Sequence, residues 1–170
     1  MNNAEQKQFF QRCLYDALMQ LMQEKKFDKI SIGELCDRAG VSRMTYYRSY
    51  NNKEDILLQH LDECFSAFLK DLAVEDSYSV ALSFFRFWQG EEEAFLAAVI
   101  RSGLSSLLVD KFSVYLDLIL PTTDLQPYAR SFLAGGLYKM LIDWMKQGCH
   151  TNPAEMAAFL ASGRKALTKL

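Results

Sequence analysis

The sequence predicts an all-α protein of about nine helices. Its 170 residues include only three prolines and eight glycines, so few positions interrupt a helix. Half of the residues are hydrophobic, which is enough to form a sizeable core. Apolar residues recur at spacings of three and four, and the long alternating runs of Val, Ile and Thr that are typical of strands are missing.

The first predicted helix covers residues 5–25. Pairs of apolar side chains recur there every four residues, which places them in one stripe along the helix. Such a stripe needs a partner, and we expect the segment that follows to supply it. The stripe consists of Phe9, Phe10, Cys13, Leu14, Ala17, Leu18, Leu21 and Met22.

Residues 31–57 contain the signals for two short helices joined by a tight turn. Ser31 and Glu34 have the spacing of a capping box, so a helix is expected to begin at residue 32. Gly40 supplies the left-handed conformation that ends this helix and turns the chain. Ser42 can cap a second helix. A helix, a glycine turn and a second helix form a helix-turn-helix unit, whose second helix lies in the DNA major groove.

The charge distribution supports a local nucleic-acid surface. The net charge of the whole chain is −2, which excludes a protein that binds nucleic acid over its whole surface. From residue 38 to residue 53, however, four basic residues and no acidic one are present: Arg38, Arg43, Arg48 and Lys53. Tyrosines are interleaved with them, and this mixture of cations and hydroxyls suits contacts with phosphate.

Residues 31–57 resemble the DNA-binding signature of the TetR family of bacterial transcription regulators. The residues that match the family pattern are Ala39, Gly40, Val41, Ser42, Thr45, Tyr47, Lys53 and Leu57. Met44, Ser49 and Tyr50 depart from the residues that are usual there, so no operator sequence can be transferred from a relative. The resemblance implies a homodimer that binds a pseudo-palindromic site on double-stranded DNA.

The predicted DNA-binding residues divide into two groups. Thr45, Tyr47 and Lys53 match the positions where the family contacts phosphate. Arg43, Met44 and Tyr46 fall in the first turn of the second helix and are expected to face base edges, with Arg43 as the candidate for a guanine contact. The full predicted set is Ser42, Arg43, Met44, Thr45, Tyr46, Tyr47, Arg48 and Lys53.

The predicted domain boundary separates a DNA-binding domain at residues 1–52 from an effector-binding and dimerisation domain at residues 53–170. A helix over 52–73 is expected to act as a lever that begins at the DNA end. The segment 74–79 is the expected joint. The remaining helices are predicted at 80–89, 92–101, 104–119, 127–147 and 153–169, with a break at 121–124.

Two features of the second domain point to binding surfaces. Aromatic residues between 84 and 95 are interpreted either as ordinary core or as the wall of an apolar effector pocket, with Phe84, Phe87, Trp88 and Phe95 as its residues. Two adjacent glycines in the helix at 127–147 indicate that another backbone comes close. The expected dimer interface comprises Gly136, Leu137, Leu141, Met145, Phe159 and Leu160.

Other classes of site are not supported by the sequence. It contains no arrangement of nucleophile and base, no phosphate-binding glycine loop and no metal cluster, so neither an enzyme nor a cofactor is expected. His60 and Cys64 lie four residues apart, but two ligands do not make a metal site. We predict reduced cysteines in a cytoplasmic protein, with no secretory signal and no membrane span.

Repression is the commoner mechanism in the family, so a repressor modulated by a small apolar effector is the preferred function. Two alternatives stay open. One is a helical adaptor of the same fold that acts through a protein partner. The other is a transcription activator, because residues 128–160 weakly resemble a TetR branch that includes an activator of dihydroxyacetone kinase genes.

Overall fold

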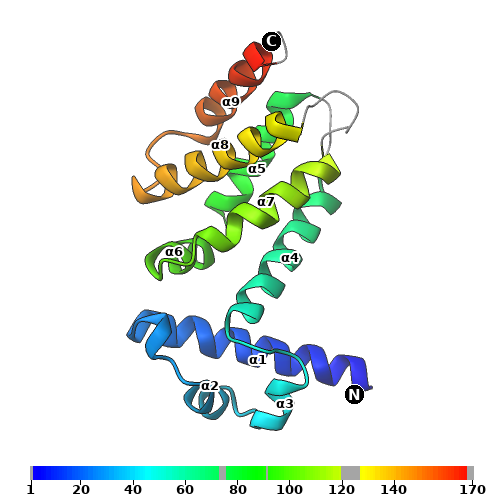
Figure 1. Ribbon diagram of the computed structural model, residues 1–170, viewed down its shortest axis with the longest axis vertical. Coiled ribbons are helices and arrows are strands. Elements are labelled where there is room, and N and C mark those ends of the chain that lie inside the picture. Colours follow the sequence, from blue (N-terminus) through cyan, green and yellow to red (C-terminus); the bar gives the residue numbers. More distant parts are fainter. Residues whose placement is uncertain (1, 73–75, 91, 120–126, 168–170) are drawn as a thin grey trace. The chain divides into compact units, whose positions relative to one another are not determined.

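The computed structural model describes residues 2–72, 76–90, 92–119 and 127–167. Over these residues the chain forms nine α-helices, one short 3-10 helix and no strand (Figure 1). The predicted all-α fold is therefore confirmed. The helices are α1 (Asn3–Glu24), α2 (Ile32–Ala39), α3 (Arg43–Tyr47), α4 (Glu54–Lys70), α5 (Ser77–Gln89), α6 (Glu93–Arg101), α7 (Ser106–Ile119), α8 (Pro127–Lys146) and α9 (Pro153–Leu167).

The chain divides into two compact units, residues 1–64 and 65–170, with the division inside α4. The predicted boundary between residues 52 and 53 lies just before α4 and stays a prediction. Of the predicted joint at 74–79, residues 77–79 belong to α5, which Asp76 caps, while residues 74 and 75 lie outside the described residues. The predicted break at 121–124 also lies outside them.

The first unit is built on the apolar stripe of α1. Leu14, Leu18 and Leu21 are completely buried, and α1 packs against α2, which in turn packs against α3. The predicted stripe is too long at its N-terminal end, because the side chain of Phe9 is 57% exposed. A 3-10 helix, Phe27–Lys29, turns the chain between α1 and α2 and buries Phe27.

The second unit has an aromatic core. Phe65 stacks on Tyr115 with ring centroids 3.7 Å apart, and its ring also meets the rings of Trp88 and Phe112 edge to face. Around this core α5 packs against α9 and α7 packs against α8. Edge-to-face aromatic pairs add about 0.5–1.5 kcal/mol each beyond the area that they bury. The cluster is therefore a substantial source of stability for this unit.

Local signals in the sequence explain the ends of several helices. Ser31 and Ser42 cap α2 and α3, and the side chain of Asn152 accepts a hydrogen bond from the amide of Glu155 at the start of α9. Gly148 adopts a φ of 73° just after α8, as a glycine at a helix end can do without strain. None of the helices in the described ranges is sufficiently long and apolar to cross a membrane.

Candidate nucleic-acid interface

The turn between α2 and α3 has the geometry that the sequence predicts. Gly40 lies in the left-handed region with φ 64° and ψ 29°. The amide of Val41 then donates to the carbonyl of Cys36 at 3.0 Å, which satisfies a carbonyl at the end of α2. A side chain at residue 40 would be strained in this conformation. The glycine therefore fixes the angle at which α3 leaves α2.

Helix α3 is short and depends on its cap. The Ser42 hydroxyl accepts a hydrogen bond from the amide of Thr45 at 3.1 Å, and the two side-chain hydroxyls lie 2.9 Å apart. These bonds hold the first turn of a helix that has only five residues. Ser42 and Thr45 therefore order the start of α3.

The outer surface of α3 carries both charged and apolar side chains. Met44 is 69% exposed and Tyr47 is 59% exposed, and Arg43 and Arg48 are exposed beside them. The guanidinium of Arg48 lies 3.6 Å from the sulfur of Met44, so the two side chains share one surface. Four of the predicted DNA-binding residues are thus accessible together, three on α3 and Arg48 at its C-terminal end.

Tyr46 differs from the expectation that it faces base edges. Its side chain is completely buried, and its ring meets those of Tyr47 and Tyr50 at centroid distances of 5.1 and 5.9 Å. Burial raises the pKa of the Tyr46 phenol to about 12. The sequence suggested exposure because Tyr46 lies in the first turn of the second helix, but the side chain points into the core and anchors α3.

Lys53 lies between α3 and α4 and already makes polar contacts within the first unit. Its ammonium donates to the carbonyls of Ile30 at 2.6 Å and Phe27 at 2.9 Å, and it lies 4.5 Å from the centre of the Phe27 ring. An ammonium has three N–H donors. Lys53 therefore ties the corner between α1 and α2 to the start of α4 and retains one donor for another partner.

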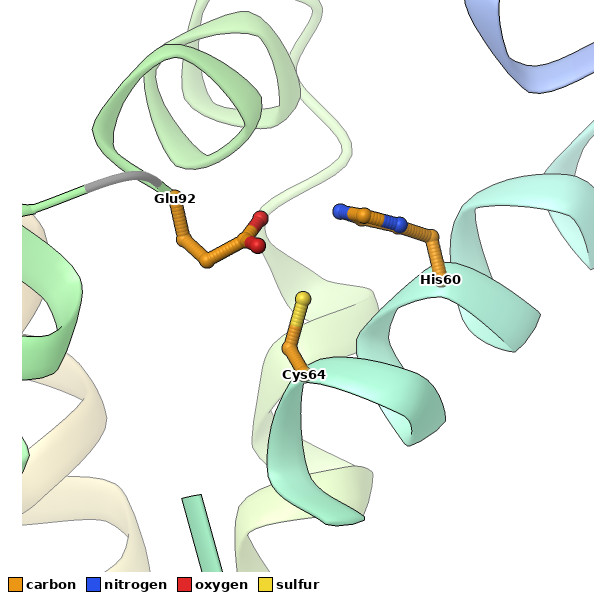
Figure 2. A group of neighbouring side chains, drawn as sticks. All are labelled: His60, Cys64 and Glu92. Atoms are coloured by element: carbon orange, nitrogen blue, oxygen red, sulfur yellow. The ribbon is translucent and has the colours of Figure 1, made fainter. Parts of the chain in front are cut away.

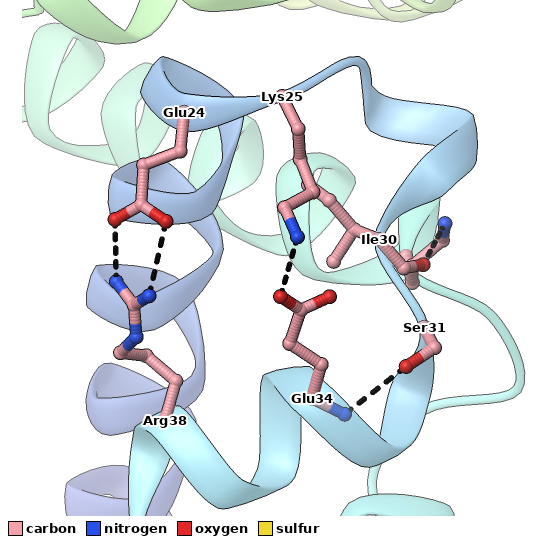
Figure 3. A network of polar contacts seen from close by, with 7 residues as sticks. Glu24, Lys25, Ile30, Ser31, Glu34 and Arg38 are labelled. Carbon is pink, nitrogen blue, oxygen red and sulfur yellow. Dashed lines mark hydrogen bonds and ion pairs between the residues drawn. The ribbon is translucent and has the colours of Figure 1, made fainter.

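Two ion pairs fasten α2 to the end of α1 (Figure 3). The guanidinium of Arg38 donates to both carboxylate oxygens of Glu24 at 2.8 and 3.0 Å, and Lys25 pairs with Glu34 at 2.6 Å. The hydrogen bond from Arg38 lowers the pKa of Glu24. Arg38 was expected to add positive charge for phosphate, but in this structure it is paired with an acid.

A groove of about 350 Å³ lies between α1 and α4 within the first unit. The carbonyl oxygen of Gln59 accepts hydrogen bonds from the Tyr50 hydroxyl at 2.6 Å and from Gln11 at 2.9 Å, and its amide donates to Glu63. Nothing in the sequence pattern indicated this network, because its members are spread over more than fifty residues. It connects the segment after α3 to both long helices of the unit.

His60 and Cys64 project from the same side of α4, as their spacing predicts (Figure 2). The imidazole of His60 stacks on the ring of Tyr15, with centroids 3.9 Å apart and planes inclined by 24°. This contact gives His60 a packing role between α4 and α1. The absence of a resident metal or cofactor stays a prediction.

The predicted effector residues belong to the aromatic core of the second unit. Phe84, Trp88 and Phe95 are at most 5% exposed, and Phe87 is half-buried. The rings of Phe87 and Trp88 meet edge to face, with centroids 5.3 Å apart. An effector at this position would have to separate aromatic side chains that pack together in the structure.

The predicted dimer residues are placed unevenly. Phe159 is 70% exposed and Gly136 is exposed, whereas Leu137, Met145 and Leu160 are half-buried. Leu141 is completely buried in its own unit and presents no surface. A Cβ atom built on Gly135 or Gly136 would meet no described atom within 4 Å, so the described part of this chain does not supply the expected close backbone approach.

Comparison with known proteins supports the assignment of the first unit. The family described as bacterial regulatory proteins, tetR family, matches residues 14–59. The fold is similar to the crystal structure of Lin0861 from Listeria innocua, with a TM-score of 0.80, 18% sequence identity and coverage of 98% of this chain and 95% of that chain. A search of the curated proteins gave no match. The chain therefore carries, in its first unit, the DNA-binding helix-turn-helix domain of the tetR family of bacterial regulatory proteins.

Proposed function

We propose that the protein is a homodimeric transcription repressor of the TetR type, acting in the cytoplasm on a pseudo-palindromic operator. The observation that carries this proposal is the exposed surface of α3, a helix that Tyr46 anchors. Its accessible residues are Arg43, Met44 and Tyr47, with Arg48 at its C-terminal end. Two copies related by a two-fold axis would present two such helices to half-sites on the same face of the duplex.

Contacts from α3 divide between bases and phosphates in this proposal. The guanidinium of Arg43 can form two hydrogen bonds with a guanine, which discriminates against other bases by roughly 1–3 kcal/mol. The hydroxyls of Thr45 and Tyr47 and the remaining donor of Lys53 suit phosphate oxygens. A repressor that binds in this way excludes polymerase from the sites that it occupies.

The dimer would form through α8 and α9. The exposed ring of Phe159 and the open surface at Gly136 support this choice, because a second copy could bury the ring and approach the backbone closely. Further large apolar side chains are exposed near the start of α8, with Tyr128 at 87% and Phe132 at 63%. An apolar surface of this kind is typical of a subunit interface.

A small apolar effector would act through the aromatic core of the second unit. It can change DNA affinity only by binding one arrangement of the two α3 helices of the dimer better than another. Each 1.4 kcal/mol of preference changes the ratio of the two arrangements by about tenfold. Because Phe84, Trp88 and Phe95 are packed, the ligand-bound state must differ from this structure in its side-chain arrangement.

The primary experiment is a mobility-shift assay with the DNA that flanks the protein's own gene, and with random duplex as the competitor. Binding of a discrete site in preference to random DNA is expected. Equal affinity for both would contradict a site-specific repressor and favour an adaptor that acts through a protein. Reporter expression in the presence and absence of the protein then distinguishes repression from activation.

The effector proposal needs its own readout. The experiment uses a Trp144→Phe variant. Because the chain has two tryptophans, the fluorescence emission of this variant reports on Trp88 alone. An apolar compound that weakens DNA binding is expected to change this emission with the same concentration dependence. If a compound alters DNA affinity but leaves the emission of Trp88 unchanged, the effector site lies elsewhere.

A further inference from the structure

Gly33 and Arg43 lie against each other across the turn of the helix-turn-helix. Gly33 is the second residue of α2, and Arg43 is the first residue of α3. A Cβ atom built on Gly33 would lie 3.3 Å from the Cζ atom of Arg43 and would collide with its terminal nitrogen Nη2. The guanidinium therefore rests on bare backbone, in a notch that exists because residue 33 has no side chain.

The backbone at residue 33 does not itself require glycine. Positive φ values occur at Gly40, Gly103 and Gly148, whereas Gly33 lies in the regular first turn of α2. Glycine in a helix is less favourable than alanine, because it loses more backbone freedom on folding. The space that it leaves for Arg43 is the feature of this position that an alanine would remove.

The dipole of α2 does not explain why Arg43 lies at this place. The N-terminal turn of a helix carries partial positive charge, so a guanidinium beside the first turn of α2 gains nothing from the helix dipole. Burial raises the pKa of the Cys36 thiol, and the positive charge of Arg43 acts in the opposite direction, which agrees with a position over α2. A side chain at residue 33 would occupy the space of the guanidinium, so the notch permits this direction of the Arg43 side chain.

We propose that Gly33 is a positioning residue for sequence reading: its notch holds the Arg43 guanidinium against α2 and so sets the base pair that Arg43 addresses. The inference rests on the proposed function, in which Arg43 contacts a guanine. The Gly33 residue itself touches no base in this account. It limits the directions open to a long side chain whose free rotation would otherwise spread its contacts over neighbouring positions.

The test uses Gly33→Ala, because the atoms that must move belong to the end of a flexible side chain. The variant is expected to melt at the wild-type temperature or a few degrees above it, since alanine favours the helix. The Nε–H signal of Arg43 in an NMR spectrum, assigned by its disappearance in Arg43→Lys, should shift. An unchanged signal would show that Arg43 does not rest in the notch and would overturn the inference without any DNA.

Sequence preference is measured next, by selection of bound duplexes from a random library. Wild type should enrich a two-fold symmetric site, and Arg43→Ala should lose preference at one symmetric pair of base positions. Gly33→Ala should lose about fivefold or more of the discrimination at that same pair and keep the preference elsewhere. In an Arg43→Ala background, Gly33→Ala should have no further effect, because the interaction that it disturbs is already gone.

The outcomes separate this inference from the function on which it rests. If wild type enriches no site, the proposed function fails, and the inference fails with it. If wild type and Arg43→Ala behave as expected but Gly33→Ala retains full discrimination, the positioning role alone is overturned. A uniform loss of affinity for all duplexes in Gly33→Ala, or an effect that persists without Arg43, would also overturn it.

Discussion

The ammonium of Lys53 donates a hydrogen bond to the carbonyl oxygen of Ile30 at 2.6 Å, across twenty-three residues of sequence. A second bond reaches the carbonyl of Phe27 at 2.9 Å. Both acceptors are main-chain atoms at the corner that sets α2 against α1. Lys53, which the family resemblance predicts to contact phosphate, thus also binds two main-chain carbonyls within the first unit.

Replacement of Lys53 by methionine should therefore affect folding as well as DNA binding. Two part-buried carbonyls lose a charged donor, and we expect the free energy of unfolding to fall by about 1–3 kcal/mol. Affinity should fall about equally for all duplexes, and the salt slope by about one unit per half-site. Urea titration and binding at several salt concentrations measure the two effects. Lys29→Met removes an exposed charge from the same corner and should leave stability unchanged. If Lys53→Met is as stable as wild type, the two hydrogen bonds from Lys53 do not stabilise the first unit.

Tyr46→Phe should leave the protein at least as stable as wild type. The Tyr46 hydroxyl is buried without a hydrogen-bond partner in the described part of the chain, so its removal loses no bond and relieves a desolvated polar atom. We expect a gain of between zero and about 1 kcal/mol in the free energy of unfolding, measured in urea. DNA preference should not change. A loss of stability would show that the hydroxyl has a hydrogen-bond partner. An altered base preference would show that Tyr46 takes part in base recognition.

Alkaline pH should destabilise the first unit through Tyr50. Burial, reinforced by the negative charge of Glu63, raises the pKa of the Tyr50 phenol to about 12 from the model-compound value of 10.0. Because the folded pKa is the higher one, the contribution to stability is complete below pH 10 and is lost as the pH rises through 12. The loss by pH 12 is up to about 2 kcal/mol. Between pH 9 and pH 12 the melting temperature should therefore fall less steeply for Tyr50→Phe than for wild type. Equal slopes would contradict a raised pKa of the Tyr50 phenol in the folded protein.

Gly136→Leu tests the proposed dimer. Gly136 is exposed and a Cβ atom built on it would meet no described atom within 4 Å, so the fold of the single subunit should persist. A leucine at a close approach between copies should weaken association by a few kcal/mol. Analytical ultracentrifugation at micromolar concentration reports the mass, and circular dichroism at the same concentration confirms the helical content. A monomeric wild type would end the dimer proposal, and a Gly136→Leu dimer as tight as wild type would exclude this face.

Local signals were sufficient for most of the architecture. Ser31, Gly40 and Ser42 act within four residues of their own positions, so their effects could be read directly from spacing. The side-chain direction of Tyr46 depends on packing against residues distant in sequence, and a five-residue helix is too short for periodicity to reveal its buried face. The pairing of Arg38 with Glu24 likewise joins residues fourteen apart. The notch at Gly33 was unpredictable because it depends on the rotamer of Arg43.

On α3, buried and exposed side chains are clearly separated, and this separation has an evolutionary consequence. Tyr46 fixes the helix from inside, while Met44 and Tyr47 extend into solvent and contribute little to the core. In the proposed function, substitution of Met44 could therefore change the preferred DNA sequence with little loss of stability. If α3 reads DNA as proposed, a lineage with this scaffold could acquire new target genes by changes on one turn of this helix. Loss of the buried Tyr46 ring would instead reduce the stability of the fold.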